Sequence, residues 1–356
     1  MRRRTRVINV GGVKIGGKNP VSIQSMTKVK TSNIAKTVKQ IKELERMGCE
    51  LIRVSVKDTN DAKAIRQIKK RIDIPLIADI HFNFRLAIES IKNGADKIRI
   101  NPGNISKTED LKEIIKLAKK YKIPMRIGIN SGSLPQGIQH TGNEVRNIIR
   151  FAKKYLNFFE RQNFRDIIIS LKSSNVSTTV EAYRAMAKLC DYPFHLGVTA
   201  AGSYDSGIVK SSIGIGALLL DGIGDTIRVS LTGDSVEEVT SAKRILKALG
   251  LRNFGPDIIS CPTCGRCQVG LIKVTKDLEK KLSGKAVSNL GKRKTSKPPV
   301  TIAVMGCEVN GPGEAGDADI GIAFGKKKGM LFKKGKILKR VKTKNAVQEL
   351  LKILKA

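Results

Sequence analysis

Residues 51–80 read LIRVSVKDTNDAKAIRQIKKRIDIPLIADI, and this stretch sets the pattern of the first 250 residues. It begins and ends with short apolar runs rich in Val and Ile, at 51–56 and 75–80. Between them, residues 61–71 place apolar side chains every three or four positions. Short apolar runs of this kind predict buried β-strands, and the three-to-four spacing predicts an amphipathic helix. The stretch therefore predicts two parallel strands joined by a helix.

The same alternation recurs along the chain. Strand-like runs occur at 21–26, 51–56, 75–80, 97–101, 125–130, 166–172, 194–199 and 226–231. Helical spacing occurs at 34–48, 61–71, 111–121, 143–163, 176–190, 206–220 and 236–250. Strand-then-helix units repeated this often in about 250 residues favour a closed parallel barrel over an open sheet. We therefore expect an α/β protein whose residues 1–250 form a (β/α)8 TIM barrel.

The pattern changes after Gly250. Apolar runs at 300–305 and 319–324 predict strands, the basic segment 326–342 has hairpin character, and 343–354 predicts a closing helix. The polar stretch 283–299 is typical of a loop or linker. Residues 251–356 are therefore expected to form a second, small α/β domain, which carries the clustered cysteines.

The composition suits a cytoplasmic globular protein. Of the 356 residues, 40% are hydrophobic, which is enough for a core. No apolar run approaches about 20 residues, so no transmembrane helix is expected. The basic, glycine-interrupted start does not make a signal peptide. In the cytoplasm thiols stay reduced, so clustered cysteines favour metal or redox chemistry over disulfides.

The chain is strongly basic, with 67 Lys and Arg against 31 Asp and Glu and a formal net charge of +36. Such a surface attracts nucleic acids, acidic proteins or phosphorylated metabolites. Aromatic residues make up only 4% and Trp is absent, so the stacking platforms of single-stranded nucleic-acid binders are scarce.

Polar side chains gather near the carboxyl ends of the predicted strands. Alternate residues of a strand share a face. The residues that share faces here are Arg53 with Ser55, Asp79 with His81, Arg99 with Asn101, Arg126 with Asn130, Ser170 with Lys172, and Arg228 with Ser230. Barrel enzymes place their active sites at these strand ends. Several guanidinium groups and a lysine in one pocket match a phosphate or diphosphate ligand.

Four of the six cysteines form a second candidate site. Cys261, Cys264 and Cys267 lie within Ser260-Cys-Pro-Thr-Cys-Gly-Arg-Cys, and Cys307 follows some 40 residues later. Two-residue gaps with a remote fourth ligand favour an iron–sulfur cluster over structural zinc, which prefers two paired knuckles. Glu314 lies seven residues after Cys307. As a ligand weaker than thiolate, it would leave one iron exchangeable.

Motifs along nearly the whole chain carry a family resemblance. They are 24–27 (QSMT), 78–82 (ADIHF), 99–104 (RINPGN), 170–172 (SLK), 210–214 (KSSIG), 222–230 (GIGDTIRVS), 261–264 (CPTC), 306–307 (GC) and 310–314 (NGPGE). In this order they resemble the bacterial 4-hydroxy-3-methylbut-2-enyl diphosphate synthases, an iron–sulfur enzyme family of the methylerythritol phosphate pathway.

The resemblance implies a fold and an activity. The fold is a TIM barrel joined to a small domain with one [4Fe-4S] cluster, in a homodimer where one subunit's cluster domain caps the other's barrel. The activity is an oxidoreductase reaction of the EC 1.17.7 class in isoprenoid precursor synthesis. It opens and dehydrates 2-C-methyl-D-erythritol 2,4-cyclodiphosphate reductively to 4-hydroxy-3-methylbut-2-enyl diphosphate, with electrons from flavodoxin or ferredoxin. Both donors are usually acidic, which gives the basic surface a second use.

The resemblance also implies residue roles. The metal ligands are Cys261, Cys264 and Cys307, with Glu314 as the fourth. The catalytic set is Asp79, His81, Asn310 and Glu314. The predicted substrate-binding residues are Arg53, Arg99, Asn101, Arg126, Asn130, Lys172 and Arg228.

The chain departs from the family pattern at three positions. Ala200 stands in Thr199-Ala-Ala-Gly where the family has an active-site Glu, so a proton donor is missing there. Lys28 replaces a common Asn, and Cys267 replaces a residue that is usually Thr or another non-cysteine. Spacing alone enlists Cys267 as the fourth ligand, whereas the resemblance assigns that place to Glu314.

Other interpretations stay open on the sequence. One is a barrel enzyme for a phosphorylated or pterin-like substrate whose cysteines hold a structural metal. Another is a family member impaired by Ala200. The non-enzyme alternative is a basic zinc-ribbon protein that binds nucleic acid.

Overall fold

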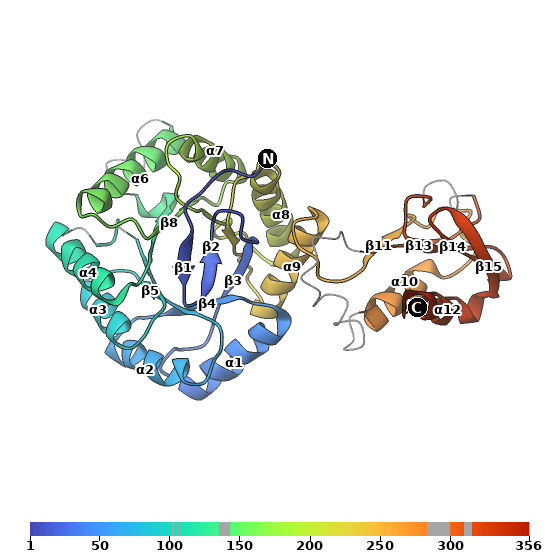
Figure 1. The fold of residues 1–356 in the computed structure, drawn as a ribbon, viewed down its shortest axis with the longest axis horizontal. Coiled ribbons are helices and arrows are strands. Elements are labelled where there is room, and N and C mark those ends of the chain that lie inside the picture. Colours follow the sequence, from blue (N-terminus) through green and yellow to red (C-terminus); the bar gives the residue numbers. More distant parts are fainter. Residues whose placement is uncertain (102, 106, 135–142, 283–299, 310–314, 356) are drawn as a thin grey trace. The chain divides into compact units, whose positions relative to one another are not determined.

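The computed structural model describes residues 1–101, 103–105, 107–134, 143–282, 300–309 and 315–355. Its contacts divide the chain into two compact units, Met1–Leu251 and Arg252–Ala356 (Figure 1). Two residues expected at the active site, Asn310 and Glu314, lie outside the described residues, as does the expected linker 283–299.

Parallel strands in the first unit form the predicted barrel. Their hydrogen-bonded order is β8-β7-β6-β5-β4-β3-β10-β9. A parallel bridge between Ile169 and Phe194 joins β8 to the segment that enters β9, so the ring closes. The bounds are β3 Ser22–Met26, β4 Leu51–Ser55, β5 Leu76–Ile80, β6 Lys97–Ile100, β7 Met125–Asn130, β8 Ile167–Lys172, β9 His195–Leu196 and β10 Thr226–Ile227. The predicted fold class is confirmed, although β9 and β10 are shorter than the runs that predicted them.

Helices surround this barrel on the outside (Figure 1). Their bounds are α1 Ile34–Met47, α2 Thr59–Lys69, α3 Phe84–Lys92, α4 Thr108–Tyr121, α6 Glu144–Arg161, α7 Val176–Ala187, α8 Tyr204–Leu220 and α9 Ser235–Ala248, with the short 3-10 turn η1 at Ser131–Ser133. The sequence did not predict α3, because its nine residues are too few to show a helical period clearly. In the described part of the chain, no helix has the length and apolar character needed to cross a bilayer.

An N-terminal hairpin, absent from the prediction, closes one end of the barrel. Its antiparallel strands are β1 Ile8–Val10 and β2 Val13–Ile15, drawn at the centre of the ring of helices in Figure 1. Side chains of the hairpin share a buried cluster with Leu51, Ile77 and Ile168, which lie at or near the starts of three barrel strands. Since this end is filled with apolar side chains, polar groups gather at the other, the carboxyl end of the strands.

The second unit is built on one mixed sheet with the order β11-β12-β13-β14-β15. Strands β11, β12 and β13 are parallel, and β13, β14 and β15 are antiparallel neighbours. The bounds are β11 Asp257–Ser260, α10 Leu271–Leu282, β12 Thr301–Met305, β13 Ile320–Phe324, β14 Lys328–Lys333, β15 Lys336–Lys342, η2 Thr343–Asn345 and α12 Ala346–Lys355. The predicted strands, basic hairpin and closing helix are therefore all present.

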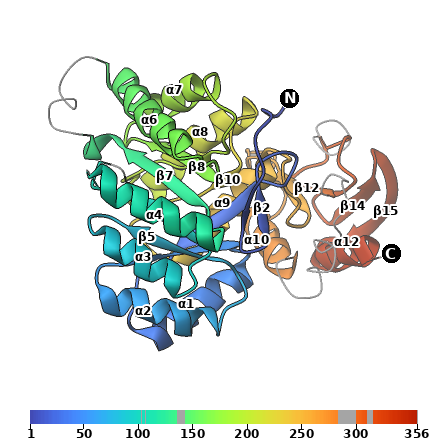
Figure 2. The same cartoon turned by 60° about the vertical axis from the view of Figure 1, so that its left-hand side comes forward.

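Two helices cover one face of this sheet. Leu271 and Leu278 of α10 and Leu350 of α12 share a core with Ile302 and Val304 of β12. Figure 2 shows α12 beside the β14 and β15 end of the sheet. The packing of α10 holds its first turn next to the strands that the cysteines follow.

Candidate active site

A cavity of about 140 Å³ lies at the carboxyl ends of the barrel strands. It is lined by Arg53, Asp79, His81, Arg99, Arg126, Asn130, Ser170, Lys172, Thr199, Arg228 and Ser230. Alternation along the strands selected all of these except Thr199. The side chains come from the ends of seven barrel strands or the residues just after them, so the closed barrel is what brings them together.

Asp79 organises the cations on one side of this cavity. Its Oδ1 lies 3.1 Å from Arg99 Nη1, and its Oδ2 lies 3.6 Å from Arg53 Nε and 3.7 Å from His81 Nε2. Burial by itself would raise the pKa of the Asp79 carboxyl, but the charges of Arg53 and Arg99 outweigh burial and hold the pKa well below its usual value. Asp79 is therefore an anion that positions its neighbours and cannot donate a proton near neutral pH.

The remaining cations are crowded and short of acceptors. Arg126 is 1% exposed, and its Nε and Nη1 have no hydrogen-bond partner among the described residues. Burial, then the charges of Arg126 and Arg228, lowers the pKa of the Lys172 ammonium well below its usual value. Five of the described lining residues are Arg or Lys and only Asp79 is acidic. An anionic ligand with several acceptor oxygens would relieve this imbalance.

Glu238 of α9 contacts charged side chains and a backbone amide at another part of the cavity's edge. Its carboxylate lies 3.6 Å from Arg228 Nη2 and 3.2 Å from Lys28 Nζ, and it accepts a hydrogen bond from the Leu231 amide. Lys28 Nζ also donates to the Leu231 carbonyl at 3.0 Å. The unusual lysine at position 28 thus links the loop after β3 to the loop after β10.

Asn101, which the sequence placed among the substrate-binding residues, does not line the cavity. Its Oδ1 accepts from the Gly103 amide at 3.1 Å and its Nδ2 donates to Ser133 Oγ at 2.7 Å. Both polar atoms are occupied in holding the loop after β6 against η1. Alternation gave the correct face, but the strand ends at Ile100, before Asn101.

The rim around Ala200 carries a carboxylate that the sequence did not indicate. Ala200 is exposed and has a φ of +49°, and Thr199 before it lines the cavity. The Thr199 amide donates to the Ser173 carbonyl at 3.2 Å, and Ser173 Oγ donates to Glu144 Oε1 at 3.2 Å. Glu144, in the first turn of α6, is thus linked to Thr199 through Ser173, the residue after Lys172, although Glu144 does not itself line the cavity. No motif surrounds it, so only the fold could find it.

A second polar layer lies deeper in the barrel. Lys97 at the start of β6 and His195 in β9 are fully buried, and their side-chain nitrogens have no hydrogen-bond partner among the described residues. Burial is the main cause that lowers the pKa of both groups well below their usual values. Neither lines the cavity. Both were missed because Lys97 begins β6 and His195 begins β9, away from the carboxyl strand ends on which the prediction was based.

The cysteines surround a separate cavity of about 220 Å³ in the second unit. It is lined by Cys261, Pro262, Cys264, Arg266, Cys267, Gly306 and Cys307. Cys261 directly follows β11 and Cys307 lies two residues after β12. Because β11 and β12 are parallel neighbours, their carboxyl ends meet, and the two distant cysteine segments come together. The described residues include no three Cys, His, Asp or Glu side chains that converge on a single ion-sized point.

Gly306 lets two sulfur atoms approach the backbone. Its amide donates to Cys261 Sγ at 3.2 Å. A Cβ built on Gly306 would stand 2.5 Å from Cys267 Sγ, so no side chain fits there. The Cys267 thiol donates to the Val269 carbonyl at 3.1 Å. Cys267 thus lines the cavity while its proton is engaged outside the set of Cys261, Cys264 and Cys307.

The fold and the two cavities together define a barrel protein with a cation-lined cavity in one unit and a cysteine-lined cavity in the other. The chain belongs to the GcpE family: the GcpE TIM-barrel domain matches residues 5–243 and the GcpE protein C-terminal domain matches residues 257–356. The resemblance drawn from the motifs is confirmed.

Curated relatives match over nearly the whole chain. A protein of Caldanaerobacter subterraneus subsp. tengcongensis is 52% identical over 99% of this chain and 97% of its own length. One of Fusobacterium nucleatum subsp. nucleatum is 51% identical over 99% of this chain and 98% of its own. Both are named 4-hydroxy-3-methylbut-2-en-1-yl diphosphate synthase (flavodoxin).

Solved structures are similar in the barrel. A dihydropteroate synthase from Stenotrophomonas maltophilia has a TM-score of 0.54 at 14% identity and covers 69% of this chain and 98% of that one. The Yersinia pestis dihydropteroate synthase gives a TM-score of 0.51 at 14% identity, covering 68% and 98%. At this identity the likeness establishes the fold alone.

Proposed function

We propose that this protein is an iron–sulfur oxidoreductase of isoprenoid precursor synthesis. It converts 2-C-methyl-D-erythritol 2,4-cyclodiphosphate to 4-hydroxy-3-methylbut-2-enyl diphosphate. With both compounds written as free acids, two electrons and two protons enter and one oxygen leaves as water. The names of relatives about 50% identical over the whole chain support this assignment.

The observation that carries the proposal is the cation-rich cavity at the barrel mouth. Arg53, Arg99 and Arg126 offer guanidinium forks, and Lys172 adds an ammonium group. In our proposal these groups bind the diphosphate, whose negative charge offsets their mutual repulsion. Because they sit on strands and are buried, they fix the orientation of the carbon skeleton before any electron arrives.

The cysteine cavity suits a [4Fe-4S] cluster by the chemistry of its donors. Cys261, Cys264 and Cys307 supply three thiolates, and the Gly306 amide already donates to one of them, as amides do at iron–sulfur sites. Glu314 stays the predicted fourth ligand and Asn310 a predicted neighbour. Such a cluster, when bound, supplies single electrons and a Lewis-acidic iron. Separating the two sites on two units lets one hold substrate while the other exchanges electrons.

The proton that leaves with the departing oxygen needs a donor. Asp79 is held ionised by its arginine partners, and Ala200 carries no acid. We propose that His81 and the rim carboxylate Glu144 are the candidates among the described residues. His81 lines the cavity, and Glu144 accepts a hydrogen bond from Ser173, the residue after Lys172 in the lining.

Several further expectations stay predictions. Flavodoxin is the proposed electron donor, in line with the names of the relatives, with ferredoxin as the alternative. A homodimer in which the cluster domain of one subunit caps the barrel of the other would keep water from reactive intermediates. A cytoplasmic location is likewise proposed. Neither a pterin substrate nor a nucleic-acid role is favoured by the family or by the cavity.

The test is anaerobic purification followed by turnover. We expect a brown protein with broad absorption near about 400 nm and about four irons per chain. With reduced flavodoxin it should convert the cyclodiphosphate to the open product, measured by phosphorus NMR. A colourless protein that holds one zinc and leaves the substrate unchanged would overturn the proposal.

Replacing Ala200 by Glu tests whether a carboxyl at this position donates the proton to the departing oxygen. Ala200 follows Thr199, which lines the cavity, and it stands where the family resemblance places an active-site Glu. We expect kcat to rise by about tenfold, less than the hundredfold or more typical of general acid catalysis, because Glu144 or His81 already serves in part. The matched control is Ala200→Gln, which has the same size and no acid. Equal kcat values for Ala200→Glu and Ala200→Gln would show that a carboxyl at position 200 does not act as the proton donor.

A further inference from the structure

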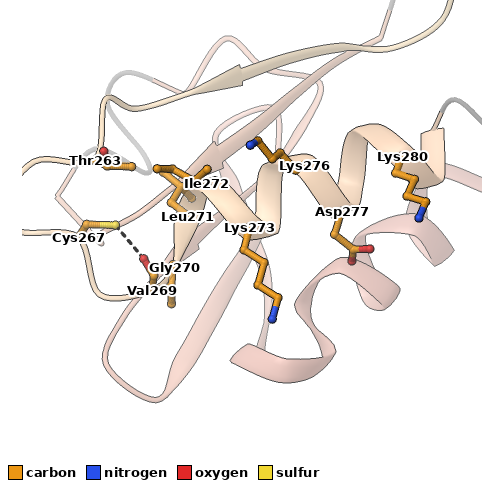
Figure 3. Close-up of a pocket in the computed structure, with 10 residues that line it drawn as sticks. All are labelled: Thr263, Cys267, Val269, Gly270, Leu271, Ile272, Lys273, Lys276, Asp277 and Lys280. Atoms are coloured by element: carbon orange, nitrogen blue, oxygen red, sulfur yellow. Dashed lines mark hydrogen bonds between the residues drawn. The ribbon is translucent and has the colours of Figure 1, made fainter.

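A groove of about 680 Å³ runs along the first turns of α10. It is lined by Thr263, Cys267, Val269, Gly270, Leu271, Ile272, Lys273, Lys276, Asp277 and Lys280. Figure 3 shows Lys273 and Lys280 on the same side of α10 as Asp277, with Lys276 on the side of Ile272. The groove is therefore a surface of mixed apolar and basic character, formed by one helix and the loop before it.

This groove shares a wall with the cysteine cavity. Cys267 lines both, and Thr263 lies between Cys261 and Cys264 in the sequence. A neighbouring hollow of about 350 Å³ on the same helix includes Cys261 together with Thr263 and Lys276. One layer of residues thus separates the outer surface along α10 from the sulfur atoms. A redox partner seated here would contact Cys267, which also lines the cysteine cavity.

The groove is basic and its lysines are available. Lys273 and Lys276 are exposed and take part in none of the ion pairs found among the described residues. Asp277 is already paired with Lys281 at 2.7 Å. Ile272, which is 63% exposed, supplies an apolar contact at the centre. A partner with carboxylates around an apolar redox centre complements this pattern.

We propose that the acidic electron donor docks in the α10 groove, with its carboxylates on Lys273 and Lys276 and the edge of its flavin toward the loop of Cys267. This inference rests on the proposed function, because it assumes that single electrons pass from a flavodoxin-like protein to the cysteine site. Each transfer oxidises the donor flavin by one electron, reduces the cluster by one, and makes or breaks no covalent bond.

The basic hairpin is the competing surface in the same unit. β14 and β15 carry many exposed lysines, and Ile337 is 58% exposed. However, β15 is three places from β12 in the sheet, and strands lie about 4.8 Å apart, so the two strands are about 14 Å apart. Charge alone would allow either surface, and proximity to the cysteines selects the α10 groove.

The experiment compares two charge-reversed variants of the full-length, cluster-loaded protein. One is Lys273→Glu with Lys276→Glu in the groove. The matched control is Lys333→Glu with Lys336→Glu, an exposed cross-strand pair of the hairpin. Each variant lowers the formal net charge by four. Acidic residues in the first turns of α10 favour the helix dipole, so the groove variant should fold.

The measurement is the rate of cluster reduction by reduced flavodoxin in anaerobic stopped flow at low salt. We expect the groove variant to be slower by about tenfold or more and the hairpin variant by less than about threefold. Reduction by dithionite, a small chemical reductant, should be the same for all three proteins. Raising the salt should slow the wild type towards the groove variant. As a second readout, oxidised flavodoxin titrated by NMR should bind the groove variant more weakly.

An equal or larger loss in the hairpin variant would overturn the proposal, as would equal binding of flavodoxin by all three. Failure of the proposed function would look different. In that case the dithionite-reduced wild type would leave the cyclodiphosphate unchanged, while the rates and binding of flavodoxin would still compare the two surfaces.

Discussion

The barrel mouth and the cysteine cavity are built in opposite ways. At the mouth, Arg126 and Lys172 lie on strands and are 1% and 7% exposed, so their positions are fixed by the barrel. In the second unit, Cys261 and Cys267 are half-buried and Cys264 is exposed, and all three lie on one loop after β11. The cation-lined cavity is therefore built from buried side chains of the barrel, whereas three of the four clustered cysteines lie on a partly exposed loop and only Cys307 is buried.

The two regions also differ in how they carry positive charge. The barrel confines its cations in a buried cavity, where burial lowers the pKa of Lys172 and Arg126. The second unit places its lysines on exposed surfaces such as β15, where they are solvated and repel one another little. Buried cations reduce stability until a ligand arrives, and exposed ones steer a partner.

The largest expected effect is at the cysteines. Serine in place of Cys261, Cys264 or Cys307 should abolish cluster binding, because a hydroxyl is a much poorer iron ligand than a thiolate. Iron content should fall to near background and the absorption near about 400 nm should disappear. The barrel's contribution to the circular dichroism spectrum should not change, since these three cysteines lie in the other unit.

Cys267→Ser is the matched control for this series. Its thiol donates to the Val269 carbonyl, and a serine hydroxyl can make the same hydrogen bond. We expect this variant to keep its iron and its colour. Bleaching by Cys267→Ser alone would show that the spacing argument was right and that Cys267 is a ligand.

The next largest expected effect is at the barrel mouth, where one substitution should raise stability and lower substrate turnover. Lys172→Met removes a crowded buried cation, so the ligand-free protein should gain about 1 kcal/mol. Turnover of the cyclodiphosphate should fall by about a hundredfold or more, because an ammonium group for the diphosphate is lost. Thermal unfolding and steady-state kinetics measure the two changes.

Lys97→Met is the companion variant. Lys97 is buried in the same barrel but does not line the cavity. The Lys97→Met variant should gain stability by a similar amount, and its KM for the substrate should stay within about twofold of the wild-type value. A large change of KM in Lys97→Met would mean that the deep layer takes part in binding.

The last expected effect is a pH dependence of stability confined to the barrel, with no change in the ligand-binding groups. The His195 pKa is lowered in the folded state, so the unfolded chain binds the extra proton first as the pH falls below about 6.5. Stability is therefore full above that pH and falls below it, by about 2 kcal/mol at pH 5. Asp79 adds nothing in this window, because its stabilising charge is lost only below about pH 4.

Calorimetry at pH 7 and pH 5 measures this change, which should lower the barrel transition by about 5 °C. His195→Leu should lose most of that dependence. All three histidines of the chain lie before residue 251, so a transition of the second unit should not move for this reason. An unchanged pH dependence in His195→Leu would assign the effect to other groups.

The sequence predicted the barrel strands better than the hairpin that closes one end of the barrel. Strand runs such as 51–56 and 75–80 were recognisable because a parallel barrel buries strands on both faces and leaves long apolar segments. The β1–β2 hairpin was not predicted, since two three-residue strands are too short for a clear alternation. Its role appeared only when the fold placed Ile8 and Val10 against Leu51 and Ile77.

For the candidate site, too, the sequence identified some residues and missed others. Alternation selected Arg126 and Lys172 because a charged residue inside an apolar strand is conspicuous. Asn101 lies just past the end of β6, where it holds a loop, and its role in substrate binding stays a prediction. Alternation missed Glu144, whose place on the rim depends on a contact with Ser173 that no local pattern encodes.

By itself the sequence determined the barrel strands, the basic lining of the barrel mouth and the clustering of the cysteines, because periodicity, charge and thiol spacing are local properties of the chain. Only the tertiary structure decided which of these groups meet. Closure of the ring brought the strand ends around Asp79, and the parallel pairing of β11 with β12 brought Cys307 to Cys261. It also showed that Cys267 and Lys276 line one groove. Such encounters depend on long-range packing, which couples residues far apart in the sequence.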